Sequence, residues 1–326
     1  MTTPPKVSVI IPSYNCGHFL RETLNSVVAQ TFKDFETILI DDGSTDNTKE
    51  VIEPYRDRIT YVQGPNKGAA AARNNGLKIA SGELIAFLDA DDLWDCEKLS
   101  AQVALMNSHP EIGVCYTNFQ CFGAPSSTTG FEERGGALLR YGREKIGKAE
   151  YVLTSTCLLT DFLSIQAFPK PSMLMVRQSC FEQVGYFDES LSICEDTQMC
   201  LRLAKYFKFA YVDCPLVERR VRTDTLASAA DDRRYASVHI QMFENLENWI
   251  PLSSRERSIT NALLSSYLFA AGYTDFAHDQ LDSSRRYLRS SLRAHFSFKG
   301  FLYFAMTYLP THWIRTLRVL RRQIAQ

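Results

Sequence analysis

Short apolar runs rich in β-branched residues recur through the first third of the chain, and stretches with helical spacing lie between them. Runs of this kind suit strands that are buried on both faces of a sheet. Strand and helix alternate so often that the pattern predicts a largely parallel α/β sheet with helices on both faces. The five runs are VSVII (7–11), TILI (37–40), ITYVQ (59–63), ELIAFL (83–88) and IGVCYT (112–117).

Two of the stretches between these runs have the pattern of amphipathic helices. In FLRETLNSVVAQ, the residues Leu20, Leu24 and Val27 form one apolar stripe. The Ala-rich stretch GAAAARNNGLKIA is expected to direct Leu77 and Ile79 inward. We therefore expect each helix to pack against the sheet.

Beyond these runs, the pattern divides the chain further. The periodicity weakens over 121–170, which we interpret as a variable insertion. PSMLMVRQSCFEQVGYFDESL (171–191) then predicts a strand and a short helix, and FKFAYVDCPLVERRV (207–221) predicts a pair of strands. The remainder of the chain shows helical periodicity only. We predict two parts: an α/β domain over 1–230 and a helical C-terminal region over 231–326.

The composition is that of an ordinary soluble globular protein, with 45% hydrophobic and 22% charged residues. A formal net charge of -1 gives no indication of nucleic-acid binding. Nine cysteines form no C-x-x-C pair, which predicts reduced thiols and a cytosolic protein. The apolar run near the N-terminus is too short for a signal peptide, so no export is expected.

Polar residues follow three of the predicted strands, and the ligand crevice of a parallel α/β sheet lies at such strand ends. In the second ending, DDGSTDNT, Gly43 permits a turn and Ser44 or Asp46 can cap the next helix. A turn and a helix cap do not explain the paired Asp41 and Asp42. A carboxylate at this position could accept a hydrogen bond from a nucleotide base or from a ribose hydroxyl. The other endings are PSYN (12–15) and DADD (89–92).

The third ending crowds Asp89, Asp91 and Asp92. Carboxylates this close raise one another's pKa unless a cation neutralises them. Mg²⁺ and Mn²⁺ take oxygen ligands from carboxylates and from diphosphates, so the cluster favours a metal–nucleotide site. A calcium loop is excluded because Trp94 stands where such a loop needs glycine. The alternative is a solvated acidic turn that caps the following helix.

A second acidic pair, Glu195 and Asp196, opens the predicted helix of SICEDTQMCLRLAKYF. Acidic residues in a first helical turn are favoured by the helix dipole. A carboxylate here can also act as a general base that removes a proton from an attacking hydroxyl. The residues alone leave both interpretations open.

Taken in order, these stretches resemble glycosyltransferase family 2, a large family of inverting enzymes with the GT-A fold. The resemblance covers most of residues 6–228, and the ordered set is far more specific than any one motif. It implies a Rossmann-like sheet and transfer of a sugar from a nucleotide-diphosphate donor, such as a UDP-sugar, to a glycan or a lipid-linked acceptor. The matching segments are VSVIIPSYN, ILIDDGSTDNT, NKGAAAARNNGL, GELIAFLDADD, GYFDESL, EDTQMCLRLA and YVDCPLVERRV.

On the donor side, the resemblance implies that Pro12 and Tyr14 line the base pocket and that Asp42 accepts from the base. The DAD segment would complete the donor site. Asp89 would contact the ribose, Asp91 would hold the Mn²⁺ or Mg²⁺ that bridges the phosphates, and Asp89 would be a second candidate metal ligand. Ala90 would lie between them.

On the acceptor side, the resemblance implies that Asp196 is the general base and that Glu195 orients the acceptor or its loop. The 121–170 insertion would lie on this side. Arg73 and Asn74 would support the aspartate loops, or else be polar residues of a helix surface. Attack at the anomeric carbon with the base on the opposite face would invert its configuration.

Arg222 stands where the family often has a histidine near the diphosphate. Arginine does not ligate metals but pairs with phosphate, so Arg222 is a candidate phosphate clamp or a surface arginine.

Other classes fit less well. A nicotinamide-binding enzyme needs G-x-G-x-x-G where this chain has PSYNCG. A sugar-1-phosphate nucleotidyltransferase would have a Gly-rich, Lys-bearing first loop. A non-catalytic nucleotide-sugar binder would not need both Asp91 and Asp196.

The C-terminal tail is basic and amphipathic. From Arg285 to Gln326 the chain has nine Lys or Arg and no Asp or Glu. An apolar stripe beside an arginine-rich face is typical of a helix in an anionic membrane interface, whereas packing on the core is the alternative. We expect a cytoplasmic protein that binds the membrane surface peripherally. The stripe consists of Trp313, Leu317, Leu320 and Ile324, and the arginines are Arg315, Arg318, Arg321 and Arg322.

Overall fold

The computed structural model describes residues 4–123, 142–166, 168–222, 232–310 and 313. The chain forms two compact units, Met1–Asp224 and Thr225–Gln326. The boundary expected near residue 230 lies outside the described residues, so the predicted domain limits stay a prediction.

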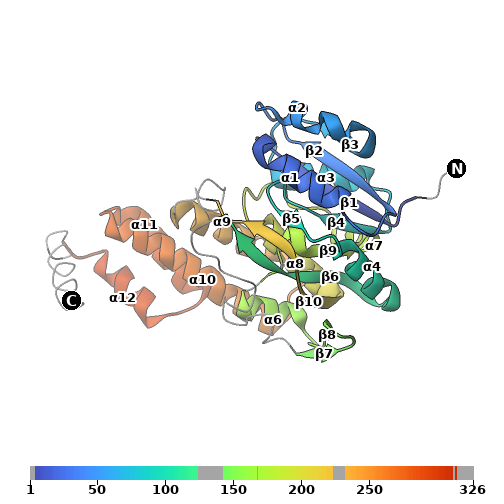
Figure 1. The fold of residues 1–326 in the computed structure, drawn as a ribbon. Coiled ribbons are helices and arrows are strands. Elements are labelled where there is room, and N and C mark those ends of the chain that lie inside the picture. Colours follow the sequence, from blue (N-terminus) through green and yellow to red (C-terminus); the bar gives the residue numbers. More distant parts are fainter. Residues whose placement is uncertain (1–3, 124–141, 167, 223–231, 311–312, 314–326) are drawn as a thin grey trace. The chain divides into compact units, whose positions relative to one another are not determined.

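Within the described residues, the first unit is built on one ten-stranded sheet of order β3-β2-β1-β4-β9-β6-β10-β8-β7, with β5 paired to β10 (Figure 1). β1 is parallel to both of its neighbours, β2 and β4, as expected of the first strands. β9 runs antiparallel between β4 and β6, and β6 is parallel to β10. The first strands are β1 (Val7–Ser13), β2 (Phe35–Asp41), β3 (Thr60–Gln63), β4 (Leu84–Phe87) and β5 (Leu93–Trp94). The later ones are β6 (Ile112–Phe122), β7 (Arg143–Lys145), β8 (Glu150–Leu153), β9 (Leu174–Arg177) and β10 (Lys208–Arg220).

The helices of this unit bury the apolar stripes that the sequence predicts, with one exception. Leu20, Leu24 and Val27 of α1 are all buried, as is Leu77 of α3. Ile79 is 45% exposed, so its predicted inward direction is wrong; it is the last residue of α3 and lies beyond the packed face. The helices are α1 (Gly17–Val28), α2 (Thr48–Ile52), α3 (Ala69–Ile79), α4 (Lys98–Ser108), α6 (Leu158–Ile165), α7 (Gln178–Val184) and α8 (Glu195–Tyr206), with the 3-10 turns η1 (Glu53–Arg58) and η3 (Pro171–Met173).

The segment 207–221 forms the single strand β10, so the predicted pair of strands is wrong. Its register with β6 shifts on both sides of Pro215. Proline has no N–H for the ladder and therefore interrupts the pairing locally. In the sequence, Pro215 resembles a boundary between two strands. In the structure, β10 continues past Pro215 to Arg220, at the edge of the sheet where the candidate site lies.

The insertion expected over 121–170 supplies the end of β6, the hairpin of β7 and β8, and helix α6. Residues 124–141, which include most of its predicted loop, lie outside the described residues.

The second unit is helical, as expected. Its core includes Ala236, Ile240, Leu268 and Ala271. No described helix is both long enough and apolar enough to cross a membrane. Residues 314–326 of the predicted basic tail lie outside the described residues. The helices are α9 (Asp232–Glu244), α10 (Ser254–Ala277), α11 (Leu281–Ala294) and α12 (Phe298–Met306), with the turn η4 (Leu246–Asn248).

Candidate active site

The loops after β1 and β2 are joined by hydrogen bonds. The Asn15 amide donates to Ser44 Oγ at 2.9 Å, and its side-chain Oδ1 accepts from the Thr45 amide at 2.8 Å. Asp46 Oδ2 accepts from the Gly17 amide at 2.8 Å. The two loops therefore form one rigid rim at the carboxyl edge of the sheet. Pro12 and Tyr14, both predicted to line a base pocket, belong to this rim, and Tyr14 is 46% exposed.

Asp41 and Asp42 both have structural partners that the sequence did not indicate. Asp41 Oδ2 accepts from the Tyr61 hydroxyl at 2.6 Å. The two carboxylate oxygens of Asp42 accept from the amides of Lys67 at 2.9 Å and Gly68 at 2.7 Å. Because a carboxylate oxygen accepts more than one hydrogen bond, these contacts leave the predicted interaction between Asp42 and a base open.

Asp92 anchors the loop after β4. Ser172 Oγ donates to its Oδ2 at 2.6 Å, and the Arg220 amide donates to its Oδ1 at 3.0 Å. Thr23 Oγ1 donates to the carbonyls of Ala90 and Asp92 at 2.9 and 3.0 Å. Burial, together with the neighbouring aspartates, raises the pKa of Asp92 to about 7. Asp92 is therefore a structural residue, and Ala90 is held by its backbone.

The other two carboxylates of this loop remain partly accessible, with side-chain exposures of 33% for Asp89 and 20% for Asp91. Arg222 Nη1 donates to Asp91 Oδ2 at 3.0 Å. Burial and the charge of Asp89 nevertheless raise the pKa of Asp91 above its usual range. A positive charge beside Asp91 is therefore favourable, and Arg222 supplies one in this structure.

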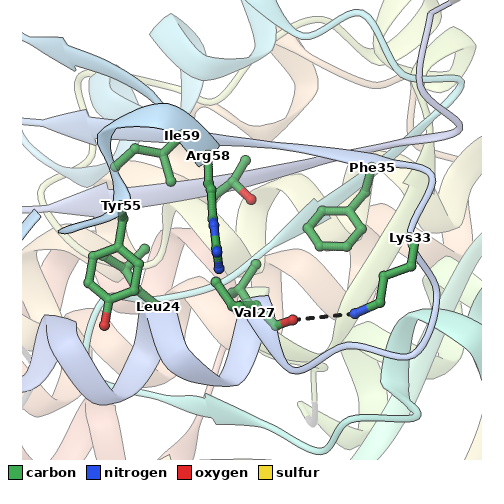
Figure 2. A pocket seen from close by; sticks show the side chains of 9 residues that line it. Leu24, Val27, Lys33, Phe35, Tyr55, Arg58 and Ile59 are labelled. Carbon is green, nitrogen blue, oxygen red and sulfur yellow. Dashed lines mark hydrogen bonds between the residues drawn. The ribbon is translucent and has the colours of Figure 1, made fainter.

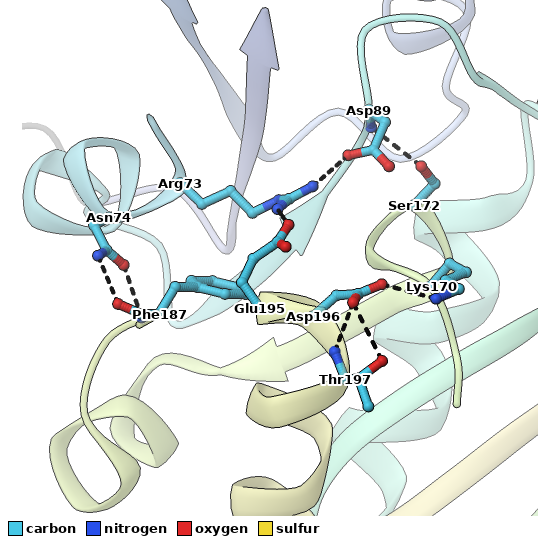
Figure 3. A network of polar contacts seen from close by, with 9 residues as sticks. All are labelled: Arg73, Asn74, Asp89, Lys170, Ser172, Phe187, Glu195, Asp196 and Thr197. Atoms are coloured by element: carbon cyan, nitrogen blue, oxygen red, sulfur yellow. Dashed lines mark hydrogen bonds and ion pairs between the residues drawn. The ribbon is translucent and has the colours of Figure 1, made fainter. Parts of the chain in front are cut away.

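Arg73 joins this loop to the start of α8 (Figure 3). The side chain is 4% exposed, and its two terminal nitrogens donate to Asp89 Oδ1 and Glu195 Oε1, each at 2.7 Å. Its neighbour Asn74 exchanges hydrogen bonds with the backbone of Phe187, at 2.8 and 3.0 Å. Arg73 and Asn74 are therefore buried bridges between segments more than a hundred residues apart, not polar residues on a helix surface.

Glu195 and Asp196 have different surroundings, although they are adjacent. Burial raises the pKa of Glu195 even though Arg73 donates to it. Burial would also raise the pKa of Asp196, but an ion pair with Lys170 at 3.0 Å holds it below its usual range. The Thr197 amide donates to the other oxygen of Asp196 at 2.6 Å (Figure 3). Asp196 is therefore ionised and held in a fixed orientation.

Lys170, Ser172 and Arg220 are the residues of this region that the sequence analysis missed. Lys170 is the last residue of the predicted insertion, Ser172 lies in η3 within the segment predicted as a strand, and no local motif marks either of them. Arg220 had a weak signal, because it is two residues before Arg222 in the same basic strand end.

Among the described residues, no three His, Cys, Asp or Glu side chains are close enough to hold a metal ion together. A Mg²⁺ or Mn²⁺ site completed by diphosphate oxygens needs only one or two carboxylates. Asp89 and Asp91 are hard oxygen donors and partly accessible, and a positive charge beside Asp91 is favourable. These residues therefore fit a divalent cation bound together with a nucleotide.

A separate pocket of about 250 Å³ lies between α1, the start of β2 and η1 (Figure 2). Its lining includes Leu24, Phe35 and Tyr55 together with Lys33 and Arg58. Phe35 is the first residue of β2, whereas the candidate site begins where β2 ends at Asp41. The pocket is therefore at the opposite edge of the sheet and does not belong to the site.

Comparison with known proteins agrees with this arrangement. A model of the glycosyl transferase family 2 matches residues 8–166. An uncharacterised glycosyltransferase of Rickettsia typhi is 30% identical over 246 residues, which are 75% of this chain and 71% of that protein. The chain belongs to glycosyltransferase family 2. A second relative is the Escherichia coli UDP-Glc:alpha-D-GlcNAc-diphosphoundecaprenol beta-1,3-glucosyltransferase WfgD, 43% identical over 116 residues, which are 35% of this chain and 46% of that protein.

Solved structures show that the fold is GT-A. S. aureus TarS 1-349 in complex with UDP-GlcNAc has a TM-score of 0.64 at 21% identity, covering 89% of this chain and 81% of that chain. The mannosyltransferase PcManGT from Pyrobaculum calidifontis, in complex with GDP-Man and Mn²⁺, has a TM-score of 0.56 at 19% identity and covers 94% of this chain and 80% of that one.

Proposed function

We propose that the protein is an inverting glycosyltransferase that moves a sugar from a UDP-sugar to a hydroxyl of a glycan or a lipid-linked acceptor. The observation that carries this proposal is the Arg73 bridge between Asp89 and Glu195. It brings the carboxylates proposed for the donor next to those proposed for the acceptor. A nucleotide-binding domain without catalysis would have no need of this connection.

On the donor side, the rim formed after β1 and β2 would receive the nucleotide. Pro12, Tyr14 and Asp42 would contact the base, and Asp89 the ribose. Arg222 would clamp the diphosphate, because a guanidinium can donate two parallel hydrogen bonds to phosphate oxygens. The choice of UDP is supported by two related proteins: the TarS structure contains UDP-GlcNAc, and the E. coli relative is named for UDP-Glc.

On the acceptor side, Asp196 would accept the proton of the attacking hydroxyl as that oxygen bonds to the anomeric carbon. The low pKa of Asp196 keeps it ionised at neutral pH, which a base requires. It makes Asp196 a weak base, which suffices because the hydroxyl becomes strongly acidic as the new bond forms. Glu195, held by Arg73, would orient the acceptor or its loop.

Asp91, with Asp89, would hold the divalent cation. When bound, the cation supplies a Lewis acid that stabilises negative charge on the departing diphosphate. Arg222, which pairs with Asp91 in this structure, would donate to the phosphates when the donor is bound, because a guanidinium pairs with either anion.

The place of action would be the cytoplasmic face of a membrane. A relative is named for an acceptor linked to diphosphoundecaprenol, which supports a lipid-linked acceptor here. The role of the basic tail in membrane binding stays a prediction, because residues 314–326 lie outside the described residues.

The proposal is tested by titrating UDP into the protein by calorimetry, with Mn²⁺ and then with EDTA. We expect binding with Mn²⁺, much weaker binding with EDTA, and weak binding by Asp91→Asn under both conditions. The exposed Asp57 provides a matched control, since Asp57→Asn should bind as the wild type does. Equal affinities with Mn²⁺ and EDTA would contradict the metal role.

Hydrolysis of nucleotide-sugars separates catalysis from simple binding. A transferase site releases some sugar to water when the acceptor is absent, whereas a non-catalytic binder releases none. Binding of UDP-sugars without any hydrolysis or transfer, over a panel of donors and acceptors, would favour the binder.

A further inference from the structure

Helix α12 is apolar on nearly all sides, and one of its faces is exposed. Phe298, Phe301 and Leu302 are 74%, 50% and 48% exposed, and Ala305 is also exposed. Their spacing of three, four and seven residues places them on one helical face. The opposite side contains the buried Gly300 and the half-buried Tyr303, whose ring packs against Phe269 and Phe276. The helix therefore packs on the unit through one side and leaves a second apolar face exposed.

Helix α11 exposes a row of arginines. Arg286, Arg289 and Arg293 are exposed and spaced by three and four residues, so they share one face, while Ser284 and Leu288 of the same helix are buried. Among the described residues, no carboxylate lies within ion-pair distance of these three arginines. Over 281–309 the chain has five Lys or Arg and one acidic residue. The positive charge of this hairpin is therefore largely uncompensated.

The two helices pack together (Figure 1), and the rings of Phe296 and Phe301 lie 6.5 Å apart, so the exposed apolar side chains continue from α12 to the turn before it. The guanidinium of Arg289 is 5.9 Å from the ring centre of Phe304, and that of Arg285 is 4.2 Å from the ring centre of Tyr308. Between the helices, Phe296 is 67% exposed. We call the α11–α12 surface the set Arg286, Arg289, Arg293, Phe296, Phe298, Phe301 and Leu302.

We propose that the α11–α12 surface docks on an anionic lipid bilayer. Transfer of exposed aromatic and aliphatic side chains into the interfacial region of a bilayer is favourable. Arginines beside them are attracted by anionic headgroups. A contiguous apolar surface of this kind on a soluble unit is a recognised mark of an interaction site. The inference concerns a surface of the helical unit and does not depend on the proposed reaction.

Other partners match this surface less well. A second copy of the chain joined through the same face would bring the arginine rows close to each other, and like charges disfavour that contact. A nucleic acid would pair with the arginines but would not bury the apolar face of α12. A bilayer with anionic lipid satisfies both features with one partner.

The test is sedimentation of the full-length protein with vesicles of phosphatidylcholine, and with vesicles of phosphatidylcholine and phosphatidylglycerol in equal parts. We expect strong binding to the anionic vesicles, little binding to the neutral ones, and weakening by salt. The double variant Phe298→Ser/Phe301→Ser and the double variant Arg286→Glu/Arg293→Glu should each bind the anionic vesicles at least about tenfold more weakly.

Matched controls come from the first unit. Ile79→Ser/Tyr206→Ser removes two exposed apolar side chains, and Lys49→Glu/Lys78→Glu makes the same change in net charge as the arginine variant. Both controls should bind as the wild type does, and every variant should keep its UDP affinity. Retained UDP binding also separates a failure of this inference from a failure of the proposed function.

Several outcomes would overturn the inference. Absence of binding at low salt, equal binding to both kinds of vesicle, or unchanged binding by the variants would each do so. A dimer in light scattering that Phe298→Ser/Phe301→Ser dissociates would assign the surface to a second copy. Loss of thermal stability in this variant, without a change in vesicle binding, would mean that the phenylalanines pack within the protein.

Discussion

Three of the carboxylates proposed to take part in the reaction lie against basic side chains. Asp89 pairs with Arg73, Asp91 with Arg222 and Asp196 with Lys170. These basic residues come from α3, from the end of β10 and from the segment before η3. Burial raises the pKa of Asp91 even beside Arg222, whereas the charge of Lys170 holds the pKa of Asp196 below its usual range. The three pairs therefore place a positive charge beside each of these carboxylates.

Replacing Asp196 should abolish transfer without abolishing donor binding. Asp196→Asn keeps the shape and the hydrogen bond from the Thr197 amide, but an amide does not accept the proton. We expect the transfer rate to fall about 10²–10⁴-fold, as is typical for a lost general base, and UDP affinity to stay close to that of the wild type. Glu195→Gln should cost less. Transfer by Asp196→Asn at a near wild-type rate would move the role to Glu195.

Removing Lys170 should change the pH dependence of the reaction. The base acts when it is ionised, so activity is lost as the pH falls through the pKa of Asp196. Lys170 holds this pKa low, and Lys170→Met should therefore shift the acidic limb of kcat/KM to higher pH. The measurement is kcat/KM against pH, with the exposed Lys208→Met as the control. A purely structural role for Lys170 predicts a lower rate with an unchanged acidic limb.

Among the elements, α3 matters most for the site, because it carries both Arg73 and Asn74. It approaches β1 at Gly76, where an added Cβ would lie 2.4 Å from Ile10 Cγ2. The glycine therefore permits a close contact between helix and strand. This contact determines how far the Arg73 guanidinium reaches toward Asp89 and Glu195.

We predict that Gly76→Ala destabilises the protein, although alanine is the better helix former. Alanine gains about 1 kcal/mol of helix propensity, but overpacking of a close contact typically costs about 1–3 kcal/mol. Urea denaturation should show a lower midpoint for Gly76→Ala and an equal or higher one for Asn75→Ala, its exposed neighbour. If the two variants are equally stable, the strand and helix have room to separate.

For the molecule as a whole, the donor site depends on segments from both ends of the first unit. Arg222 follows the last strand, and it meets Asp91 and the ring of Phe19 in α1, at 4.6 Å from its centre. Nucleotide binding should therefore stabilise this unit as one body.

A thermal-unfolding series tests this expectation. UDP with Mn²⁺, at a hundred times its Kd, should stabilise the wild type by about 2.7 kcal/mol. Arg222→Met should bind UDP more weakly by about 1.5–3 kcal/mol, because a charge-assisted contact to phosphate disappears. At the same ligand concentration, UDP should therefore stabilise this variant less than the wild type. Arg56→Met, which changes an exposed arginine, is the control. An unchanged shift in Arg222→Met would argue against the phosphate clamp.

Much of the fold follows from local patterns. The runs at 7–11, 37–40, 59–63, 83–88 and 112–117 all became strands, and β1 and β4 are buried as a continuous apolar run requires. β3 is the edge strand and is largely exposed, so the prediction that this run is buried on both faces is wrong. The ordered motifs were enough to predict the family. β10 was misread because Pro215 interrupts its pairing, and Ile79 because a helical pattern does not show where the covered face ends.

The site itself was predictable only in part. The sequence indicated Asp89, Asp91, Glu195 and Asp196, since crowded carboxylates are conspicuous in any chain. The resemblance indicated that Arg73 supports the aspartate loops, but not that it also reaches Glu195. The sequence contained no information that Lys170 pairs with Asp196 or that Asp42 holds the loop of Lys67 and Gly68. Strand and helix formation depends on neighbours along the chain, whereas these contacts join residues 16 to 122 positions apart. Their partners are chosen by the packing of the sheet, which brings distant segments to the same edge.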